Sequence, residues 1–489
     1  MAFYNYLPSF GLSLSLLAAL LVFYYFIYPA FISPLSKLEI PNADPLAKYT
    51  PLWILWRRFT QRENKTLYEA HKKLGPVVRV GPNEISVNSL EGLRVIYGGN
   101  FDKHAWYPNV FSNYFIDNTF CITKAEPHKE RKRMFANVYS KSYLQSSKDI
   151  HRNAKSLLFD RLLPIFQSAS ETSKGVEMLE LSAAVGMDWT CAFLFGLSAG
   201  SDFIRDAEYR KHWLDTYDEV KSFFAYISEG FVIPLVLANK VGYKWMPNSV
   251  LETLDSMGKW NLDMCKKVQN QEISSEISTQ TSRPVGFEQM TQGMEKVDSK
   301  RLKNPKDMVI ASEMLDQILA GHETTAITLT YMMYELCRHP EIQTALRNEV
   351  SGLTPKLSFP VGPHYLPDPK SIDRLPLLDA VIQETLRRYP PASGSAPRVT
   401  PPGQTTLHGI SGIPEGVRVS CSAYTLHRNE DVFPNPEEWK PSRWLDASKE
   451  QKAEMNRWFW AFGSGARMCL GIHFAMQGTP HRIFITATC

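Results

Sequence analysis

A single cysteine in a glycine-rich loop near the C-terminus constrains this chain more than any other feature. The loop runs from Phe462 to Gly471, and Arg467 stands two residues before Cys469. Glycines on either side of a cysteine let a flat cofactor approach the backbone closely. A cysteine so placed can offer a thiolate to a metal. We therefore expect the rest of the chain to hold a bound group above this sulfur.

The other cysteines form no competing pattern. The seven cysteines are scattered through 489 residues, at positions 121, 191, 265, 337, 421, 469 and 489. An odd, dispersed set without a CxxC pair argues against a disulfide framework or a zinc site, and for a reducing compartment. The alternative interpretation of any one cysteine, a buried bystander, fits Cys191 or Cys337 better than Cys469.

The N-terminus carries a candidate membrane anchor. The 23 residues from Phe10 to Ile32 contain no charge, and as a helix they would span roughly 30 Å, the thickness of a bilayer core. No basic residue precedes the run, whereas Lys37, Lys48, Arg57 and Arg58 follow it. This asymmetry favours an anchor over a cleaved signal peptide and places the body of the protein on the cytoplasmic side. Pro29 and Pro34 are expected to kink or end the helix.

Behind the anchor, the patterns predict one large, mainly α domain with a minority of β (an α+β fold). Residues 1–33 are the expected anchor, 34–50 a proline-rich linker, 51–477 the domain and 478–489 an atypical tail. Hydrophobic residues at 44% and charged residues at 21% suit a globular core. The net charge of +4 gives no nucleic-acid signature. The predicted segments are helices at 66–73, 305–338, 340–350 and 375–388, a hairpin at 77–87, short strands within 398–419, and a mobile polar connection at 269–305.

Three further patterns carry possible chemistry. Glu323 and Thr324 lie in the middle of the long predicted helix, where a carboxylate and a hydroxyl can position water and pass protons. Alternatively, the threonine simply bonds the carbonyl four residues back. Glu384 and Arg387 share a helix face and form either a surface ion pair or a buried one. The basic run after His128 is a solvated face, a site for anionic cofactor groups, or a docking site for an acidic partner.

The order of these motifs resembles that of the cytochrome P-450 superfamily, the haem-thiolate monooxygenases. An acid–alcohol helix is followed by Glu-x-x-Arg and then by Phe-x-x-Gly-x-Arg-x-Cys-x-Gly. The resemblance runs from the anchor to about Gln477 and is closest to microsomal, fungal-type members, on stretches such as 131–134 and 137–142. A haem-thiolate monooxygenase fold behind a transmembrane helix is therefore expected.

The resemblance implies roles for particular residues. Cys469 would be the axial thiolate on the iron of haem b, and Phe462 would shield the sulfur. Arg467, Arg398 and His128 look like partners of the haem propionates. Glu384 and Arg387 would lock the scaffold together with Arg443. Glu323 and Thr324 look like the pair that relays protons to iron-bound dioxygen, and Ala320 and Gly321 would leave room for oxygen and substrate. The aromatic stretch 101–120 is either a lid packed on the core or a wall of the pocket. As a wall, it would line the pocket together with residues 392–396.

The resemblance also implies partners and a location. A basic face including Lys129 and Lys132 would meet an acidic, NADPH-dependent flavoprotein reductase, because the chain has no flavin or nicotinamide fingerprint of its own. The location implied is the endoplasmic reticulum membrane, with the catalytic domain in the cytoplasm. The substrates implied are O₂ and a lipophilic small molecule, as in fungal terpenoid, polyketide or alkaloid biosynthesis.

Two departures from the family pattern accompany this resemblance. Ser442 stands where the motif around Arg443 usually has a glutamate. The family-like register stops near Gln477, and the remaining tail is expected to be a truncated or mis-spliced end.

Two alternative functions therefore stay open. One is a haem-thiolate isomerase or dehydratase without O₂ activation, which the Glu323–Thr324 pair disfavours. The other is an inactive truncated product.

Overall fold

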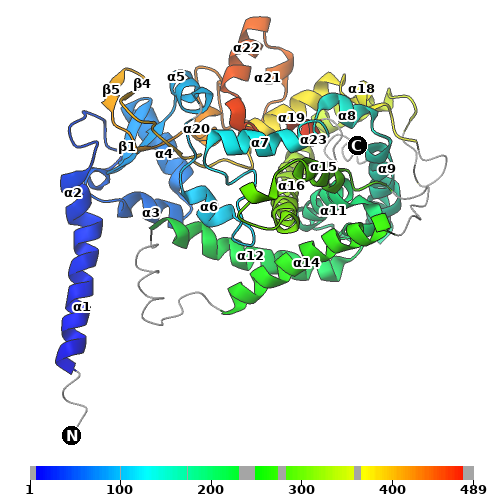
Figure 1. Ribbon diagram of the computed structural model, residues 1–489. Coiled ribbons are helices and arrows are strands. Elements are labelled where there is room, and N and C mark those ends of the chain that lie inside the picture. The colour runs from blue at the N-terminus through cyan, green and yellow to red at the C-terminus, as the bar shows by residue number, and fades with distance from the viewer. Residues whose placement is uncertain are drawn as a thin grey trace.

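The computed structural model describes residues 7–99, 101–172, 174–230, 248–273, 282–356, 359 and 365–476. Helices dominate it, and the strands gather on the side nearest the N-terminal helices (Figure 1). This arrangement confirms the mainly α fold with a minority of β. The predicted tail, 478–489, lies outside the described residues.

The α-helices of the N-terminal half are α1 (Leu7–Val22), α2 (Tyr28–Ile32), α3 (Leu52–Phe59), α4 (Glu63–Leu74), α5 (Leu90–Leu93), α6 (Trp106–Phe111), α7 (Ala125–Phe135), α8 (Lys141–Ser146), α9 (Lys148–Lys155), α10 (Leu163–Thr172), α11 (Met178–Ala199) and α12 (Ala207–Gly230). Those that follow are α14 (Asn248–Ile273), α15 (Val285–Glu295), α16 (Lys306–Arg338), α17 (Pro340–Ser351), α18 (Pro369–Ile372), α19 (Pro376–Arg388), α20 (Ala423–Leu426), α21 (Ser442–Leu445), α22 (Lys449–Trp458) and α23 (Ile472–Met476). Shorter helical turns are the π-helical η1 (Phe23–Ile27), η3 (Arg94–Gly98) and η4 (Ser156–Leu162), and the 3₁₀ turns η2 (Pro45–Lys48), η5 (Ser299–Arg301) and η6 (Gly465–Arg467).

Most of the predicted helices are confirmed, and one connection is not. The helices predicted at 66–73, 305–338, 340–350 and 375–388 correspond to α4, α16, α17 and α19. The predicted mobile connection at 269–305 is wrong over 285–295, which forms α15. Phe287, Met290 and Met294 of this helix are buried in the main core. Its apolar residues are spaced for one helix face, and the polar residues around them obscured that signal.

The sheet joins segments far apart in the chain. Its strands are β1 (Val77–Gly81), β2 (Glu84–Val87), β3 (Arg398–Val399) and β6 (Arg418–Ser420), in the order β1-β2-β6-β3. The predicted hairpin is the antiparallel pair β1–β2, whereas β2 and β6 run parallel. A separate antiparallel pair is formed by β4 (Thr405–Leu407) and β5 (Ile410–Ile413). The sheet thus places Arg398 next to the N-terminal part of the domain.

The centre of the helical part is the pair α11 and α16. Gly186 of α11 and Gly321 of α16 permit their close approach. A Cβ on Gly186 would come within 2.9 Å of the His322 carbonyl oxygen, and one on Gly321 within 2.3 Å of the Thr190 hydroxyl. The glycine and threonines in mid-helix lower the helix propensity of α16. The helix is nevertheless continuous from Lys306 to Arg338 because packing on both sides stabilises it.

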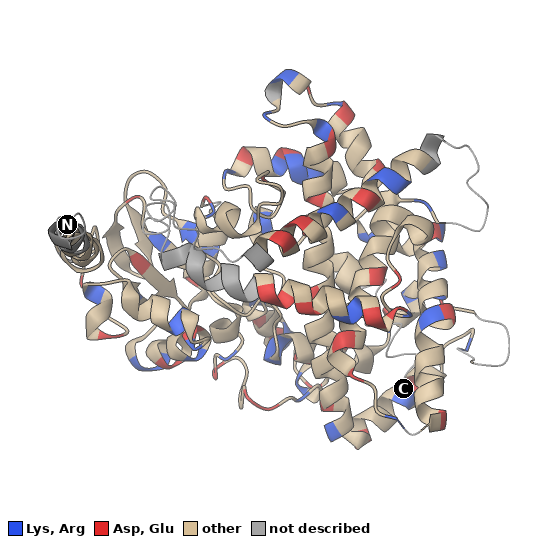
Figure 2. Cartoon of the chain, turned by 90° about the horizontal axis from the view of Figure 1, so that it is seen from below, with Lys and Arg blue, Asp and Glu red and all other residues tan. Residues whose placement is uncertain are grey.

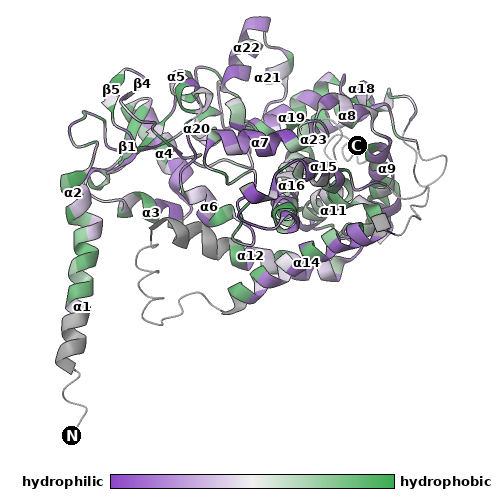
Figure 3. Cartoon of the chain, viewed as in Figure 1, coloured by the Kyte–Doolittle hydropathy of each residue, from purple (hydrophilic) through white to green (hydrophobic). Residues whose placement is uncertain are grey.

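The N-terminal helices stand away from the rest of the protein. In Figure 1, α1 points away from the domain, and Figure 3 colours its described part largely hydrophobic. Pro29 does not end the helical run, since α2 continues to Ile32. The π-helical turn η1 directly precedes α2 and accommodates the missing N–H of the proline. By length and composition, the described helix that could span a membrane is α11, but 89% of its apolar 18-residue window is buried inside the protein. The apolar N-terminal segment 15–27 is shorter.

The segment 34–50 packs on the sheet rather than extending freely as a linker. Leu35 and Ile40 are buried in the core beside β2. The buried Arg79 guanidinium of β1 donates hydrogen bonds to the carbonyls of Leu35 and Leu38, the latter at 3.0 Å. Asn42 pairs with Arg79 through a parallel β-bridge. The proline-rich segment 34–50, here called the strap, therefore packs against the sheet. The folded part of the chain begins before residue 51.

Candidate functional site

The loop that carries Cys469 has the tight backbone expected of it. Gly463 and Gly465 both have φ of +69°, a conformation that favours glycine. A Cβ on Gly465 would lie 2.3 Å from the carbonyl oxygen of Tyr97, so this position also needs glycine for space. The N–H of Cys469 donates to the carbonyl of Phe462 at 2.9 Å, which closes the loop. The helix expected after the cysteine is α23.

Cys469 is an exposed residue whose thiol group is largely surrounded by protein. Of the described cysteines, Cys469 and Cys337 are exposed, whereas Cys191 and the others are buried. The bystander interpretation therefore suits Cys191 but not Cys337. Desolvation raises the pKa of the Cys469 thiol, whereas the Gly471 N–H and the Lys132 ammonium act in the opposite direction and favour the thiolate. The Gly471 N–H and the Lys132 ammonium are thus the partners that stabilise the thiolate form of Cys469.

Lys132, predicted to belong to a basic docking face, lies against this loop. Its Nζ donates to the carbonyl of Ala466 at 3.1 Å and to that of Met468 at 2.8 Å. Lys129, on the same helix α7, is exposed and pairs with Glu126 at 3.3 Å. Only Lys129 of these two lysines therefore presents its charge outward. Sequence reasoning missed the contact of Lys132 because it joins residues more than 300 positions apart.

A cluster of cationic side chains lies beside the loop. Its members are Lys103, His128, Lys132, Arg398 and Arg467, and they come from α7, β3, η6 and the segment before α6. Burial and the neighbouring positive charges lower the pKa of Lys103 well below its usual value. The same causes lower the pKa of His128 to about 3 and that of Arg467 to about 10. The structure thus brings the predicted residues Arg398, His128 and Arg467 together and adds Lys103 to them.

The backbone explains how this cluster is assembled. Lys103 and Arg398 face each other across an antiparallel β-bridge, and the N–H of Val399 donates to the carbonyl of Asp102 at 3.0 Å. Arg467 reaches back to the same region. Its guanidinium donates to the carbonyls of Ile122 at 2.7 Å and Thr123 at 2.8 Å. Three distant parts of the chain therefore meet at one place.

The cluster fits the anionic edge of a haem. Burying several like charges together is unfavourable unless an anion neutralises them. The two propionates of haem are such anions, and a carboxylate pairs well with arginine donors. Cys469 lies close enough to the Lys132 member of the cluster for its charge to act on the thiol. The residues present therefore suit a flat group with one thiolate ligand and two carboxylates at its edge.

Glu384 and Arg387 form a fully buried ion pair rather than a surface pair, and the partly buried Arg443 joins it. The Arg387 guanidinium donates twice to the Glu384 carboxylate, at 2.8 Å each. The Nε of Arg443 lies 3.5 Å from Glu384 Oε1, and Arg443 also donates to the carbonyl of Pro434 at 2.7 Å. The indole of Trp444 donates to Glu384 at 2.9 Å. This network ties α19 to α21 and to the irregular segment before it. Ser442 does not prevent Arg443 from joining.

The acid–alcohol pair on α16 is divided between two environments. Thr324 is exposed, and its hydroxyl donates to the carbonyl of Ala320 at 2.8 Å, as threonine in a helix often does. Glu323 accepts a hydrogen bond at 3.0 Å from the hydroxyl of Tyr217 on α12. Ala320 is exposed as well, although the helix around it is largely buried. Thr324 and Ala320, one turn apart, therefore share an accessible stripe of α16.

Gly321 allows close helix packing and does not leave the expected room for oxygen and substrate. Thr190 of α11 occupies the space that a side chain at position 321 would need. Ala320 keeps the expected position on the accessible stripe. Tyr217, which sequence reasoning missed, is a site candidate through its contact with Glu323. Its own stretch of α12 carried no motif that could have identified it.

The aromatic stretch 101–120 contains the short helix α6 within an otherwise irregular segment, as expected. Its rings pack edge-to-face, with Phe111 and Phe120 centroids 4.9 Å apart. Tyr107 accepts a hydrogen bond from Arg398 at 3.1 Å. This segment therefore covers the cation cluster.

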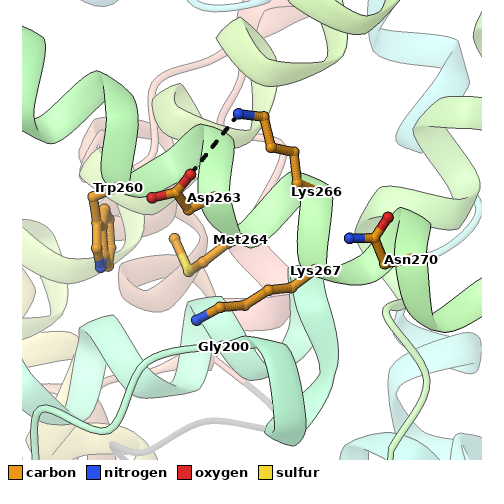
Figure 4. Close-up of a pocket in the computed structure, with 7 residues that line it drawn as sticks. All are labelled: Gly200, Trp260, Asp263, Met264, Lys266, Lys267 and Asn270. Carbon is orange, nitrogen blue, oxygen red and sulfur yellow. Dashed lines mark ion pairs between the residues drawn. The ribbon is translucent and has the colours of Figure 1, made fainter.

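A surface depression of about 370 Å³ lies elsewhere, along α14 (Figure 4). It is lined by Gly200, Trp260, Asp263, Met264, Lys266, Lys267 and Asn270. None of the predicted site residues belongs to it, and its charged residues include the exposed pair Asp263 and Lys266. Within the described parts of the chain, no group of three or more histidine, cysteine or acidic residues gathers as a metal site. Figure 2 shows charges of both signs interspersed over the helices seen from below, without a single-sign surface.

Comparisons with known proteins agree with this geometry. The profile of the family described as Cytochrome P450 matches residues 46–479. Cytochrome P450 monooxygenase avaI of Aspergillus versicolor is 27% identical over 431 residues, covering 85% of this chain and 95% of that protein. Cytochrome P450 monooxygenase orf2 of Aspergillus niger is 28% identical and covers 92% of this chain and 85% of its own length. Cytochrome P450 monooxygenase FGM1 of Gibberella zeae is 25% identical, with 87% of this chain and 80% of that protein covered.

Proposed function

This chain belongs to the cytochrome P450 family, and on that premise we propose that it inserts one oxygen atom of O₂ into a lipophilic small molecule. Membership makes the protein an oxidoreductase that uses haem with a cysteine thiolate ligand and needs a redox partner, a substrate and O₂. The observation that carries the proposal is the cation cluster beside the glycine loop of Cys469. A cysteine in a glycine loop and cations for two carboxylates suit this cofactor.

The proposal gives each residue a role in holding the cofactor. Cys469 is the axial ligand, and Phe462 closes its loop. Arg398, His128 and Arg467 bind the propionates, with Lys103 beside them. Haem supplies the redox chemistry of oxygen insertion when bound, and a thiolate ligand favours cleavage of the O–O bond.

The other proposed roles belong to the scaffold and to proton supply. The Glu384–Arg387–Arg443 network holds the segment that leads to the loop. Thr324 offers a hydroxyl on the accessible stripe of α16, while Glu323, oriented by Tyr217, holds a carboxylate next to it. Together they can position water and pass protons. The presence of this pair supports oxygen activation over an isomerase or dehydratase.

A difference spectrum of the reduced protein under carbon monoxide tests the proposal. A Soret band characteristic of thiolate ligation is expected, and Cys469→Ala should abolish it.

Consumption of NADPH with a reductase should then fall in Thr324→Ala. Thr344→Ala is the control and should have no effect, because Thr344 is an exposed threonine on α17 whose hydroxyl donates to the carbonyl four residues back. A folded, purified protein without haem would contradict the proposal. A thiolate band that survives in Cys469→Ala would refute the assignment of the ligand.

We also propose that α1 and α2 anchor the protein in the endoplasmic reticulum membrane with the domain on the cytoplasmic side. The apolar N-terminal run followed by basic residues supports this orientation. The amphipathic α3 supports a second contact with the bilayer, because Trp56 and Phe59 are 60% and 58% exposed. Carbonate extraction of membranes and protease protection of an N-terminal tag would test the anchor and its orientation.

The remaining proposals concern the redox partner and the substrate. The exposed face of α7, including Lys129, would dock an acidic NADPH-dependent flavoprotein reductase. The resemblance to fungal-type members supports a terpenoid, polyketide or alkaloid intermediate as the substrate. Because one fold serves many substrates, substrate-induced spectral shifts across panels of these three classes are the direct test.

A further inference from the structure

Lys132 lies on α7 between the surface of the protein and the cysteine loop. The side chain is half-buried, and its Nζ donates to two carbonyls of that loop, 3.1 Å from Ala466 and 2.8 Å from Met468. Met468 directly precedes Cys469. One ammonium therefore spans the turn from which the cysteine projects, and it ties this turn to α7.

The charge of Lys132 is not neutralised by a carboxylate within the described parts of the chain. The ion pairs there leave Lys132 out, whereas its neighbour Lys129 pairs with Glu126. The loop carbonyls of Ala466 and Met468 are thus the polar partners that hold this cation in place.

We propose that Lys132 is a positioning residue for Cys469, which fixes the cysteine loop and keeps one positive charge beside the thiolate. This inference rests on the proposed function, because it requires Cys469 to be the haem ligand. A positive charge next to the sulfur stabilises the extra electron of the reduced state. Lys132 therefore raises the reduction potential of the bound haem.

The position of Lys132 on α7 extends the proposal to the redox partner. Lys129 and Arg133 are exposed on the same helix, close to Lys132 in sequence. A partner that docks on these residues would therefore lie next to the side chain that contacts the cysteine loop.

Redox titration of the purified, haem-containing full chain tests this role without any substrate. Lys132→Met should lower the midpoint potential and promote loss of thiolate ligation in the reduced carbon monoxide complex. Lys132→Arg keeps the positive charge and the hydrogen-bond donors, so its midpoint potential and thiolate ligation should match those of the unmodified protein. Lys129→Met removes a lysine from the same helix without touching the loop, and it should match the unmodified protein.

Two results would overturn the inference. One is a Lys132→Met protein with the same midpoint potential and carbon monoxide spectrum as Lys129→Met. The other is a Lys132→Arg protein whose midpoint potential is lowered as much as that of Lys132→Met. If Lys132→Met does not hold haem, Lys132→Gln takes its place, because an amide still donates to a carbonyl but carries no charge. An unchanged potential in Lys132→Gln then refutes the role of the charge. A protein that shows no thiolate-ligated haem before any substitution would instead refute the proposed function.

Discussion

At the level of single residues, the Glu-x-x-Arg spacing shows how little a short pattern says without its surroundings. It occurs at six places in the sequence, among them Glu384 and Arg387, and Glu454 and Arg457 on α22. The first pair is fully buried, with a bidentate contact of 2.8 Å. The second is a single contact of 3.1 Å whose side chains are 55% and 40% exposed. The order of motifs along the chain, rather than the spacing, distinguished the two.

We predict that Arg387→Leu unfolds or severely destabilises the domain, whereas Arg457→Leu does not. Removing the arginine leaves the Glu384 carboxylate buried without its main partner, which costs about 3–5 kcal/mol. An exposed pair contributes about 0–1 kcal/mol. Denaturant unfolding of the two variants in parallel measures the difference. Equal stability of the two proteins would show that the buried network does not support the fold.

The residues that sequence reasoning found are those that belong to a motif. Cys469, Arg467, Glu384 and Arg387 lie where the patterns put them. Lys103 and Tyr217 do not belong to such patterns, and Lys132 was predicted only as part of a basic docking face. Each acts through a contact with a distant segment, and only the folded topology brings those segments together.

Among the secondary-structure elements, the contact between α11 and α16 depends on glycine. A Cβ on Gly186 would lie 2.9 Å from the carbonyl oxygen and 3.0 Å from the Cα of His322. Both are backbone atoms of α16, so a side-chain rotation cannot relieve the clash. The accessible stripe with Ala320 and Thr324 is part of the same helix.

We therefore predict that Gly186→Ala destabilises the protein by about 1–3 kcal/mol, the usual cost of overpacking, despite the better helix propensity of alanine. Gly175→Ala is the matched control, because a Cβ there meets no atom within 4 Å. Thermal unfolding of both variants measures the effect. A Gly186→Ala protein as stable as Gly175→Ala would mean that the two helices can separate freely.

The strap at 34–50 leads to a prediction about truncation. Deletion of residues 2–32 should leave the domain folded, because those residues precede Leu35 and the carbonyls bound by Arg79. Deletion of residues 2–41 should lower the melting temperature, since it removes buried Leu35 and Ile40 and leaves the Arg79 guanidinium unsatisfied. Solubility without detergent and thermal unfolding distinguish the two truncations. If both melt alike, the strap contributes nothing to stability.

Helices and turns with strong local signals were predictable, and those stabilised by tertiary packing were not. Pro305, Pro340 and Pro376 mark the starts of α16, α17 and α19. The helix α15 and the packing of 34–50 depend on apolar residues that meet a surface formed elsewhere. Just before Pro29 the helical run is interrupted by a π-helical turn rather than ended, and it ends at Ile32, two residues before Pro34.

For the protein as a whole, buried neutral histidines tie stability to pH. The Nε2 of His427 accepts a hydrogen bond from the Trp460 N–H at 2.7 Å, so its Nδ1 donates to the Arg387 carbonyl at 3.0 Å. His71 is held in the same way between the Gly75 carbonyl and the Ser86 hydroxyl. Burial, the main cause, lowers the pKa of His427 to about 3 and that of His71 to about 4.

We predict that the protein loses stability as the pH falls from 6.5 toward 4. In that range the unfolded chain binds a proton at each of these histidines and the folded chain does not, so acid favours unfolding. The loss amounts to about 1.4 kcal/mol per pH unit for each histidine. Denaturant unfolding at pH 7 and pH 5 measures it. His427→Gln should reduce the slope because the amide cannot titrate. A stability that is equal at the two pH values would contradict the neutral, buried state of His427 and His71.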